Sequence, residues 1–255
     1  VNRSSKLIMD AKICGVKNSS TLNFLLKHKC PPKYIGFICN YPKSKRYLNF
    51  GDLKKLLKVT KNPKVNFVSV LVDPNEDTLR KISKLNFDYL QLYDVSPEKT
   101  LKIKKDLKIK VISAITVSDI EDVLMYKKYK NISDIILFDS KGYEKSESFN
   151  HHLLKIVSDK IKIMLAGNIK YSDKLDKYNK IADIIDLSGS LETNGEKDIS
   201  KIDIFLKNLN KLKYETKKKI PLIDQHNKYG FWGGKFGGSY IPETLKKPVD
   251  DLTKE

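Results

Sequence analysis

The stretch VNFVSVLV at residues 65–72 decides the fold class of this 255-residue chain. It is an apolar, β-branched run of strand length, and the run ISDIILF at residues 132–138 has the same character. Strands that are apolar on both faces are typical of parallel sheets with helices packed on each side. These two stretches therefore predict an α/β domain.

Short runs of this kind recur along the chain, and a longer amphipathic, lysine-rich segment follows each of them. We expect strands near residues 10–15, 33–39, 65–72, 87–92, 109–115, 132–138, 161–166 and 183–187. Eight such βα units predict a (β/α)8 TIM barrel. A doubly wound open sheet has the same local alternation, but the glycine-rich dinucleotide motif that would support it does not follow the first strand.

Helix-start signals agree with this alternation. Asn18 before two serines predicts the N-cap of the first helix, and Ser96 followed by Pro97 predicts that of the fourth. Ser118, three residues before Glu121, predicts a capping box at the start of the fifth helix.

The net charge of the chain indicates which ligands it attracts and says little about its fold. The chain has 49 Lys and Arg against 31 Asp and Glu, a formal net charge of +18, and its lysines are spread evenly. A positive field attracts phosphorylated or carboxylated substrates and also nucleic acid, but nucleic-acid sites favour clustered arginine with aromatic partners. We therefore expect a small anionic substrate, with nucleic acid as the less favoured partner. No apolar run reaches the length of a membrane helix, so we expect no membrane partner.

Three cysteines, Cys14, Cys30 and Cys39, are an odd number without metal-ligand spacing, and the four histidines show no ligand pattern. We expect neither a disulfide framework nor a metal site. Free thiols and the polar N-terminal residues predict a cytoplasmic protein.

In a TIM barrel the active site lies where the strands end, so the residues at those ends are the candidates for chemistry. Cys14 ends the first strand; it could act as a base or nucleophile, or it could be a small buried hydrophobe. Asp139 ends the sixth strand; it could be a general acid with a raised pKa, or it could cap the next helix.

Other strand ends carry groups suited to anions. Arg46, in the loop after the second strand, could grip a carboxylate bidentately or be a surface charge. Gly167 and Asn168 follow the seventh strand, and Ser188 and Gly189 follow the eighth. These two loops form the usual phosphate site of TIM barrels, although turns need glycine in any case.

Several segments, taken together and in order, resemble the phosphoribosylanthranilate isomerase family. They are KICG at residues 12–15, GFI at 36–38, SKRY at 44–47, QL at 91–92, DS at 139–140, LAG at 165–167, DLSG at 186–189 and GEKD at 195–198. The resemblance covers residues 10 to about 212.

This resemblance implies an enzyme of tryptophan biosynthesis. Its reaction would be the Amadori rearrangement of N-(5-phosphoribosyl)anthranilate to 1-(2-carboxyphenylamino)-1-deoxyribulose 5-phosphate, without cofactor or metal. Asp139 would be the general acid that protonates the ribose ring oxygen, and Cys14 the general base that removes the C2 proton.

The resemblance also implies the residues that bind the substrate. Arg46 would hold the anthranilate carboxylate, and Gln91 would contact the substrate. Backbone amides near four further residues would bind the phosphate: Gly167, Asn168, Ser188 and Gly189.

The chain departs from the family pattern at several points. The family's Gln-Leu-His-Gly is QLYD at residues 91–94, its Ser-Pro-Arg is SKR at 44–46, and its Ser-Ser-Gly-Val-Glu is SGSLE at 188–192. Asn168 stands where the family has a second glycine, and residues 141–146 replace a glycine-rich stretch after the acid. The acid, the base and the arginine are all present.

The last part of the chain has a different character. Residues 229–245, YGFWGGKFGGSYIPETL, resemble the start of a tryptophan synthase β chain, whose pyridoxal-phosphate lysine and phosphate loop are absent here. We expect a barrel over residues 1–212 and a linker with a truncated, poorly ordered β-chain start over 213–255. Fusion to, or association with, a tryptophan synthase β chain is a possible arrangement.

Two other functions stay open from the sequence. One is another TIM-barrel isomerase of a ribosyl or ribulosyl phosphate, such as the histidine-pathway enzyme. That enzyme would place aspartates where Cys14 and residues 113–114 stand. The other is a degenerate, non-catalytic barrel that serves as a scaffold or polyanion binder.

Overall fold

Eight parallel strands form a closed barrel in a computed structural model that describes residues 9–142, 149–158 and 160–219. The strands are β1 (Asp10–Cys14), β2 (Tyr34–Ile38), β3 (Asn66–Val72), β4 (Tyr89–Tyr93), β5 (Lys110–Val117), β6 (Ile135–Ser140), β7 (Ile163–Leu165) and β8 (Ile184–Leu187). Each pairs with the next, and β1 pairs with β8, with Lys12 opposite Asp186. The predicted TIM barrel is confirmed, and the open doubly wound sheet is excluded because the first and last strands are joined.

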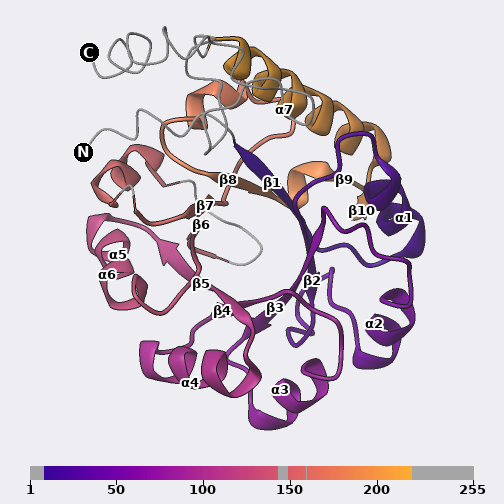
Figure 1. Ribbon diagram of the computed structural model, residues 1–255, viewed down its shortest axis with the longest axis vertical. Helices are drawn as coiled ribbons and strands as arrows, with labels where there is room; N and C mark the ends of the chain where they lie inside the picture. The colour runs from indigo at the N-terminus through magenta and orange to yellow at the C-terminus, as the bar shows by residue number, and fades with distance from the viewer. Residues whose placement is uncertain (1–8, 143–148, 159, 220–255) are drawn as a thin grey trace, which may run out of the picture. The chain divides into compact units, whose positions relative to one another are not determined.

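Helices surround the barrel, as Figure 1 shows. They are α1 (Ser19–Lys27), α2 (Phe50–Leu56), α3 (Glu76–Ile82), α4 (Pro97–Leu107), α5 (Ile120–Leu124), α6 (Tyr126–Tyr129) and α7 (Ile199–Lys219). Among the described residues, the connections after β6 and β7 hold no α-helix but the 3₁₀ segments η1 (His151–Ile156) and η2 (Leu175–Tyr178).

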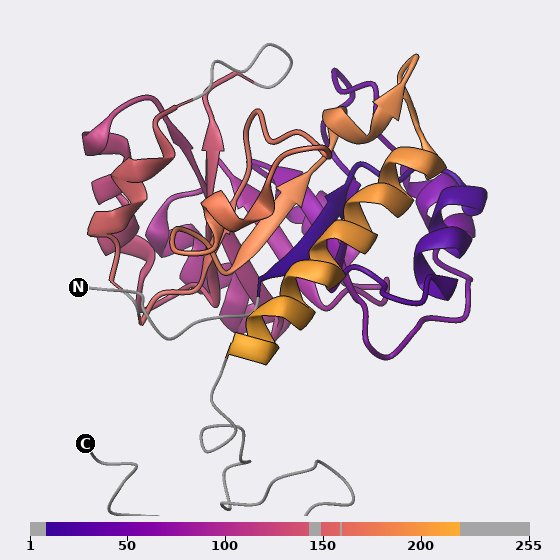
Figure 2. The same ribbon diagram turned by 90° about the horizontal axis from the view of Figure 1, so that it is seen from above.

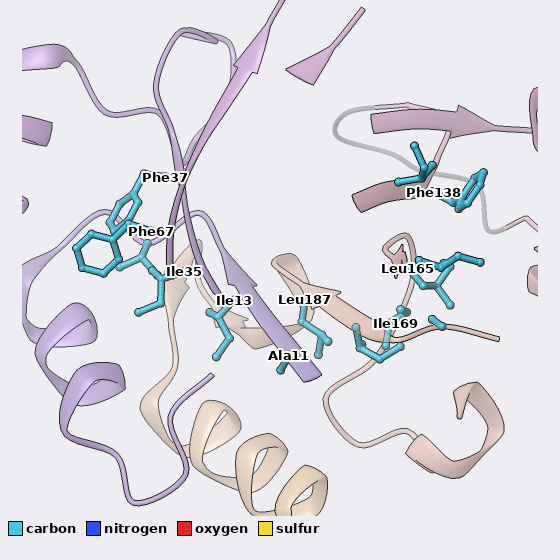
Figure 3. Close-up of a cluster of buried hydrophobic side chains, with 14 of the residues drawn as sticks. Ala11, Ile13, Ile35, Phe37, Phe67, Phe138, Leu165, Ile169 and Leu187 are labelled. Carbon is cyan, nitrogen blue, oxygen red and sulfur yellow. The ribbon is translucent and has the colours of Figure 1, made fainter. Parts of the chain in front are cut away.

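Side chains alternate along each strand between two apolar cores, as the two-residue period of a strand requires. One set, which includes Val68 and Leu137, packs in the interior of the barrel. The other set, which includes Ile13, Phe37 and Leu187, packs in the layer between the strands and the helices. Figure 3 shows part of this outer core. The inward set matters for function, because at the carboxyl ends of the strands it becomes the lining of a pocket.

The helix-start signals were predicted correctly at two of three positions. The Asn18 side chain accepts a hydrogen bond from the Thr21 amide at 2.9 Å, and Ser96 caps α4 with Pro97 in its first turn. The prediction for Ser118 is wrong by one residue, because Asp119 is the N-cap of α5 and accepts from two backbone amides. A carboxylate suits the positive end of a helix better than a hydroxyl does, which explains why the aspartate takes the position.

A short hairpin follows β8 and belongs to the rim of the barrel. The segment η3 (Gly189–Leu191) leads into β9 (Glu192–Thr193) and β10 (Glu196–Lys197), which pair antiparallel. Figure 2 shows this hairpin projecting beyond the end of the strands. Glu192 in the hairpin binds Arg46 in the loop after β2, so two distant segments meet at this rim.

None of the described helices combines the length and the apolar character that crossing a bilayer requires. The expected linker and β-chain start fall mostly on residues 220–255, and the altered loop after the acid falls on residues 143–148. Both lie outside the described residues.

Candidate active site

A cavity of about 600 Å³ opens at the carboxyl ends of the strands. All eight residues predicted as site residues line it: Cys14, Arg46, Gln91, Asp139, Gly167, Asn168, Ser188 and Gly189. The parallel topology explains the convergence, because it brings the ends of all eight strands to the same face. The thiol and the carboxyl group therefore share one pocket, as an acid–base pair acting on one small molecule must.

The thiol of Cys14 lies beside a buried ion pair. Lys12, two residues earlier on β1, is fully buried, and its Nζ lies 2.7 Å from Asp186 Oδ2 on β8. The Lys12 ammonium is also close enough to the Cys14 sulfur to favour its ionised form. Burial by itself would lower the pKa of Lys12, but Asp186 and Cys14 outweigh it and raise that pKa, so Lys12 stays charged.

Burial raises the pKa of the Cys14 thiol, and the neighbouring Lys12 ammonium opposes that rise. The sulfur has room because β2 carries a glycine opposite it. A Cβ on Gly36 would lie 2.8 Å from Cys14 Sγ and 3.1 Å from Lys12 Nζ. Any side chain at position 36 would therefore displace the thiol or the ammonium group.

The carboxyl group of Asp139 lies on β6, within the strand rather than after it, and does not cap a helix. Its Oδ2 accepts a hydrogen bond from the Tyr93 hydroxyl at 2.8 Å, and its Oδ1 accepts from the Ser140 amide at 2.8 Å. Burial raises the pKa of Asp139 to about 6, although these two donors and Lys12 oppose the rise. A pKa near neutrality suits a group that gives up a proton in each turnover.

Arg46 reaches the rim of the pocket with its guanidinium already engaged. Its Nε and Nη2 donate to the two oxygens of Glu192 at 2.6 and 2.8 Å, in a bidentate pair. Lys197 Nζ also contacts Glu192, at 2.5 Å, and donates to the Ser188 carbonyl at 3.1 Å. Burial would raise the pKa of Glu192, but Arg46 and Lys197 hold it below its ordinary value.

The ends of β7 and β8 form a further part of the pocket wall. Gly167 and Asn168 both have positive φ, +87° and +53°, so the chain turns sharply after β7. A Cβ on Gly167 would lie 2.0 Å from Ser140 Oγ and 2.7 Å from its backbone nitrogen, so only glycine fits there. Ser188 Oγ donates to the Cys14 carbonyl at 3.1 Å, which ties the end of β8 to β1.

Sequence reasoning did not assign roles to five residues of this site: Lys12, Tyr93, Asp186, Glu192 and Lys197. A signal for three of them was present. Lys12 and Tyr93 each stand two residues from a predicted site residue on the same strand, and Asp186 stands two residues before Ser188, which follows β8, so the two-residue period gives each the inward face. Glu192 and Lys197 have no such signal, because the hairpin that carries them follows no strand period.

Within residues 9–142, 149–158 and 160–219, no three or more His, Cys, Asp or Glu side chains are grouped so that they could hold a metal ion.

A closed (β/α)8 barrel with a buried carboxyl, a buried thiol and several cations at the carboxyl ends of its strands defines a TIM-barrel enzyme for an anionic substrate. The family model described as N-(5'-phosphoribosyl)anthranilate isomerase matches residues 11–208. The chain belongs to this family.

Curated relatives agree with this assignment over nearly their whole length. The N-(5'-phosphoribosyl)anthranilate isomerase of Rhizobium etli is 35% identical over 207 residues, which are 77% of this chain and 91% of that protein. The isomerase of Clostridium acetobutylicum is 32% identical over 217 residues, which are 79% of this chain and 98% of that protein.

Solved structures give the same family. The crystal structure of phosphoribosyl anthranilate isomerase from Thermotoga maritima has a TM-score of 0.70 and 27% identity, and the match covers 80% of this chain and 100% of that one. A crystal structure of a phosphoribosyl anthranilate isomerase in complex with reduced 1-(o-carboxyphenylamino)-1-deoxyribulose 5-phosphate has a TM-score of 0.69, 26% identity and the same coverage.

Proposed function

We propose that this chain isomerises N-(5-phosphoribosyl)anthranilate to 1-(2-carboxyphenylamino)-1-deoxyribulose 5-phosphate, with Asp139 as general acid and Cys14 as general base. The isomerase activity and its place in tryptophan biosynthesis are those of the family to which the chain belongs. The two catalytic roles are supported by one observation: a carboxyl with a pKa of about 6 and a thiol beside a buried ammonium line the same cavity.

The first step is ring opening. Asp139 donates its proton to the ribose ring oxygen while the lone pair of the anthranilate nitrogen forms a double bond to C1 and the C1–O bond breaks. This step yields an iminium ion and the ionised Asp139 carboxylate. The negative charges that the substrate brings into the pocket favour the protonated form of Asp139 beforehand, because like charges raise a carboxyl pKa.

The second step is proton removal from C2. Cys14 acts in its thiolate form, after its own proton has passed to solvent. The thiolate takes the C2 proton, the electron pair moves into the C1–C2 bond, and the iminium ion becomes a neutral enolamine. The enolamine then tautomerises, gaining a proton at C1 and losing the enol proton, to give the ketone. Lys12 stabilises the thiolate because its buried ammonium lies against the sulfur.

Binding groups for two anions line the pocket, and Gly189 lies beside the guanidinium of Arg46. Arg46 would hold the anthranilate carboxylate, and the backbone amides of Gly167, Asn168, Ser188 and Gly189 would bind the phosphate. Glu192 keeps the guanidinium of Arg46 in a fixed plane through its bidentate pair. The substrate carboxylate then binds a donor that is already oriented.

The test is the decay of phosphoribosylanthranilate fluorescence with the purified full-length chain. The chain should consume the substrate, and Cys14→Ser and Asp139→Asn should each lower kcat by at least about 10²-fold, the usual scale for losing a general acid or base. Matched controls are Cys30→Ser and Asp106→Asn, which change the same residue types outside the pocket. Near-normal turnover in Cys14→Ser or Asp139→Asn refutes that residue's role. No turnover by the unmodified chain, with salt-sensitive binding of nucleic acid, would instead indicate a non-catalytic barrel.

We also propose that residues 213–255 form a linker and the start of a tryptophan synthase β-like domain, because residues 229–245 resemble that start. A related proposal is that the natural polypeptide is fused to, or associates with, a tryptophan synthase β chain. Co-purification with a β chain, and its loss in a chain ending at residue 219, would test the association. A cytoplasmic location is supported by three cysteines that are all free.

A further inference from the structure

A chain of two hydrogen bonds links β4 to the general acid. Gln91 and Tyr93 lie two residues apart on β4 and both line the pocket. Gln91 Nε2 donates to the Tyr93 hydroxyl at 3.3 Å, and that hydroxyl donates to Asp139 Oδ2 at 2.8 Å. The order of donors is therefore Gln91, Tyr93, Asp139.

This order fixes which way the Gln91 amide is turned. The Tyr93 hydroxyl has one proton and donates it to Asp139 Oδ2, which can accept it both when the carboxyl is ionised and when the acid's own proton is on Oδ1. The tyrosine oxygen then offers only lone pairs, so the group of Gln91 that faces it must be the NH₂ group. Burial raises the pKa of Tyr93 well above its ordinary value, with the charge of Asp139 next in importance, so the hydroxyl keeps its proton.

The other end of the amide is left without a partner. Gln91 is 1% exposed, and among the described residues nothing donates to its Oε1. A buried acceptor in this state is unfavourable until a donor reaches it. Oε1 itself has almost no exposed surface. Because Gln91 lines the pocket, a small shift of its side chain brings Oε1 within reach of a substrate donor, and the sugar hydroxyls are the neutral donors that a ribose-derived substrate carries.

We propose that Tyr93 is a positioning residue that acts on two substrate-facing groups at once. It holds the carboxyl of Asp139 in place, and it turns the Gln91 amide so that Oε1 accepts a hydrogen bond from a sugar hydroxyl of the bound substrate. This inference rests on the proposed function for the nature of the substrate. Tyr93 stands where the chain departs from the family's Gln-Leu-His-Gly, so this arrangement belongs to this chain's own residues.

The first test measures Asp139 without substrate, so it is independent of whether the chain is an isomerase. The groups that face this carboxyl are the Tyr93 hydroxyl, the Ser140 amide, the Lys12 ammonium and the Asp186 carboxylate. Tyr93 favours the ionised form, so Tyr93→Phe should raise the Asp139 pKa from about 6 by roughly one unit or more. The measurement is a carboxyl ¹³C NMR titration, in which the Asp139 signal is identified by its absence from Asp139→Asn.

Two further variants keep this test decisive. Tyr34→Phe removes the hydroxyl of a buried tyrosine that does not line the pocket, and it should leave the Asp139 pKa unchanged. If Tyr93→Phe does not fold, a fluorinated tyrosine at position 93 keeps the shape and makes the hydroxyl a stronger donor. It should lower the Asp139 pKa, opposite to the phenylalanine. An Asp139 pKa that moves with neither change overturns the proposal.

The second test concerns Gln91. In the unmodified background, Gln91→Met removes the amide at similar size and should raise KM roughly 3- to 10-fold with a smaller change in kcat. In the Tyr93→Phe background the amide is no longer oriented, so the same change should raise KM much less. An equal increase of KM in both backgrounds would overturn the link from Tyr93 to Gln91. A loss of thermal stability alone, with KM and the Asp139 pKa unmoved, would reduce Tyr93 to a packing residue.

Discussion

The two sides of the pocket hold the proposed base and the proposed acid by different means. On the β1–β8 side, Cys14 lies next to the Lys12–Asp186 ion pair, whose side chains are 0% and 6% exposed. On the β4–β6 side, Asp139 is held by neutral donors, Tyr93 and the Ser140 amide. A full cation stabilises a thiolate strongly but must itself be compensated, whereas neutral donors adjust a carboxyl without adding charge. Substitutions on the β1–β8 side should therefore destabilise the fold strongly, whereas substitutions on the β4–β6 side should mainly change the pKa of Asp139.

The largest expected effect comes from breaking the ion pair on the thiol side. Lys12→Met leaves Asp186 buried without its partner and should destabilise the fold by about 3–5 kcal/mol. Lys33→Met is the matched control, because its pair with Asp10 has a similar length of 2.8 Å but side chains 42% and 18% exposed. That change should cost about 0–1 kcal/mol. Urea unfolding measures both, and equal losses would contradict the contrast between buried and exposed pairs.

The next effect should appear on the carboxyl side as a pH dependence of stability. Burial raises the pKa of Asp139 from 3.8 to about 6, so between these values the folded chain holds a proton that the unfolded chain has lost. Stability contributed by this group therefore falls as pH rises from 4 to 6, by up to about 3 kcal/mol. The difference between the unmodified chain and Asp139→Asn, measured by unfolding at each pH, should show this fall. A difference that stays constant with pH would mean that burial does not shift this carboxyl.

A smaller effect is expected at the rim, outside both sides. Arg46→Ala should raise KM about 10- to 100-fold while kcat changes little, because a charge-assisted bidentate contact to the substrate is lost. Arg80→Ala is the control, since Arg80 is exposed on α3 and pairs only with Asp77 of the same helix among the described residues. Steady-state kinetics with the fluorescent substrate measure both. An unchanged KM in Arg46→Ala would remove this arginine from the substrate site.

The sequence was sufficient to predict the barrel fold, because a short apolar run marks the position of each strand. The run at residues 65–72 became β3 (Asn66–Val72), and the run at 132–138 became β6 (Ile135–Ser140), which begins later and extends two residues further. Strand ends depend on pairing, and β6 continues because Thr116 and Val117 of β5 pair with its last two residues. Local sequence does not carry that information.

The candidate site was predictable in position but not in detail. Cys14 and Asp139 were found at strand ends. The two-residue period carried a signal for Lys12 and Tyr93 on the same inward faces, although neither was among the predicted site residues. What the sequence could not supply is which inward side chains touch. Lys12 meets Asp186 across the closure of the barrel, 174 residues away, and Arg46 meets Glu192 from 146 residues away. Contacts of this kind depend on the closed geometry and on side-chain conformations.

Gly167 links the proposed phosphate-binding turn after β7 to the proposed proton donor on β6. It turns the chain at the phosphate end, and it also lies against Ser140, whose amide holds the Asp139 carboxyl. A methyl group there, as in Gly167→Ala, would push Ser140 away and tilt the proton donor without touching it. With the proposed roles, a change of backbone at the phosphate-binding turn would therefore also alter proton delivery by Asp139, and a redesign of that turn for a different substrate would have to keep Ser140 in place.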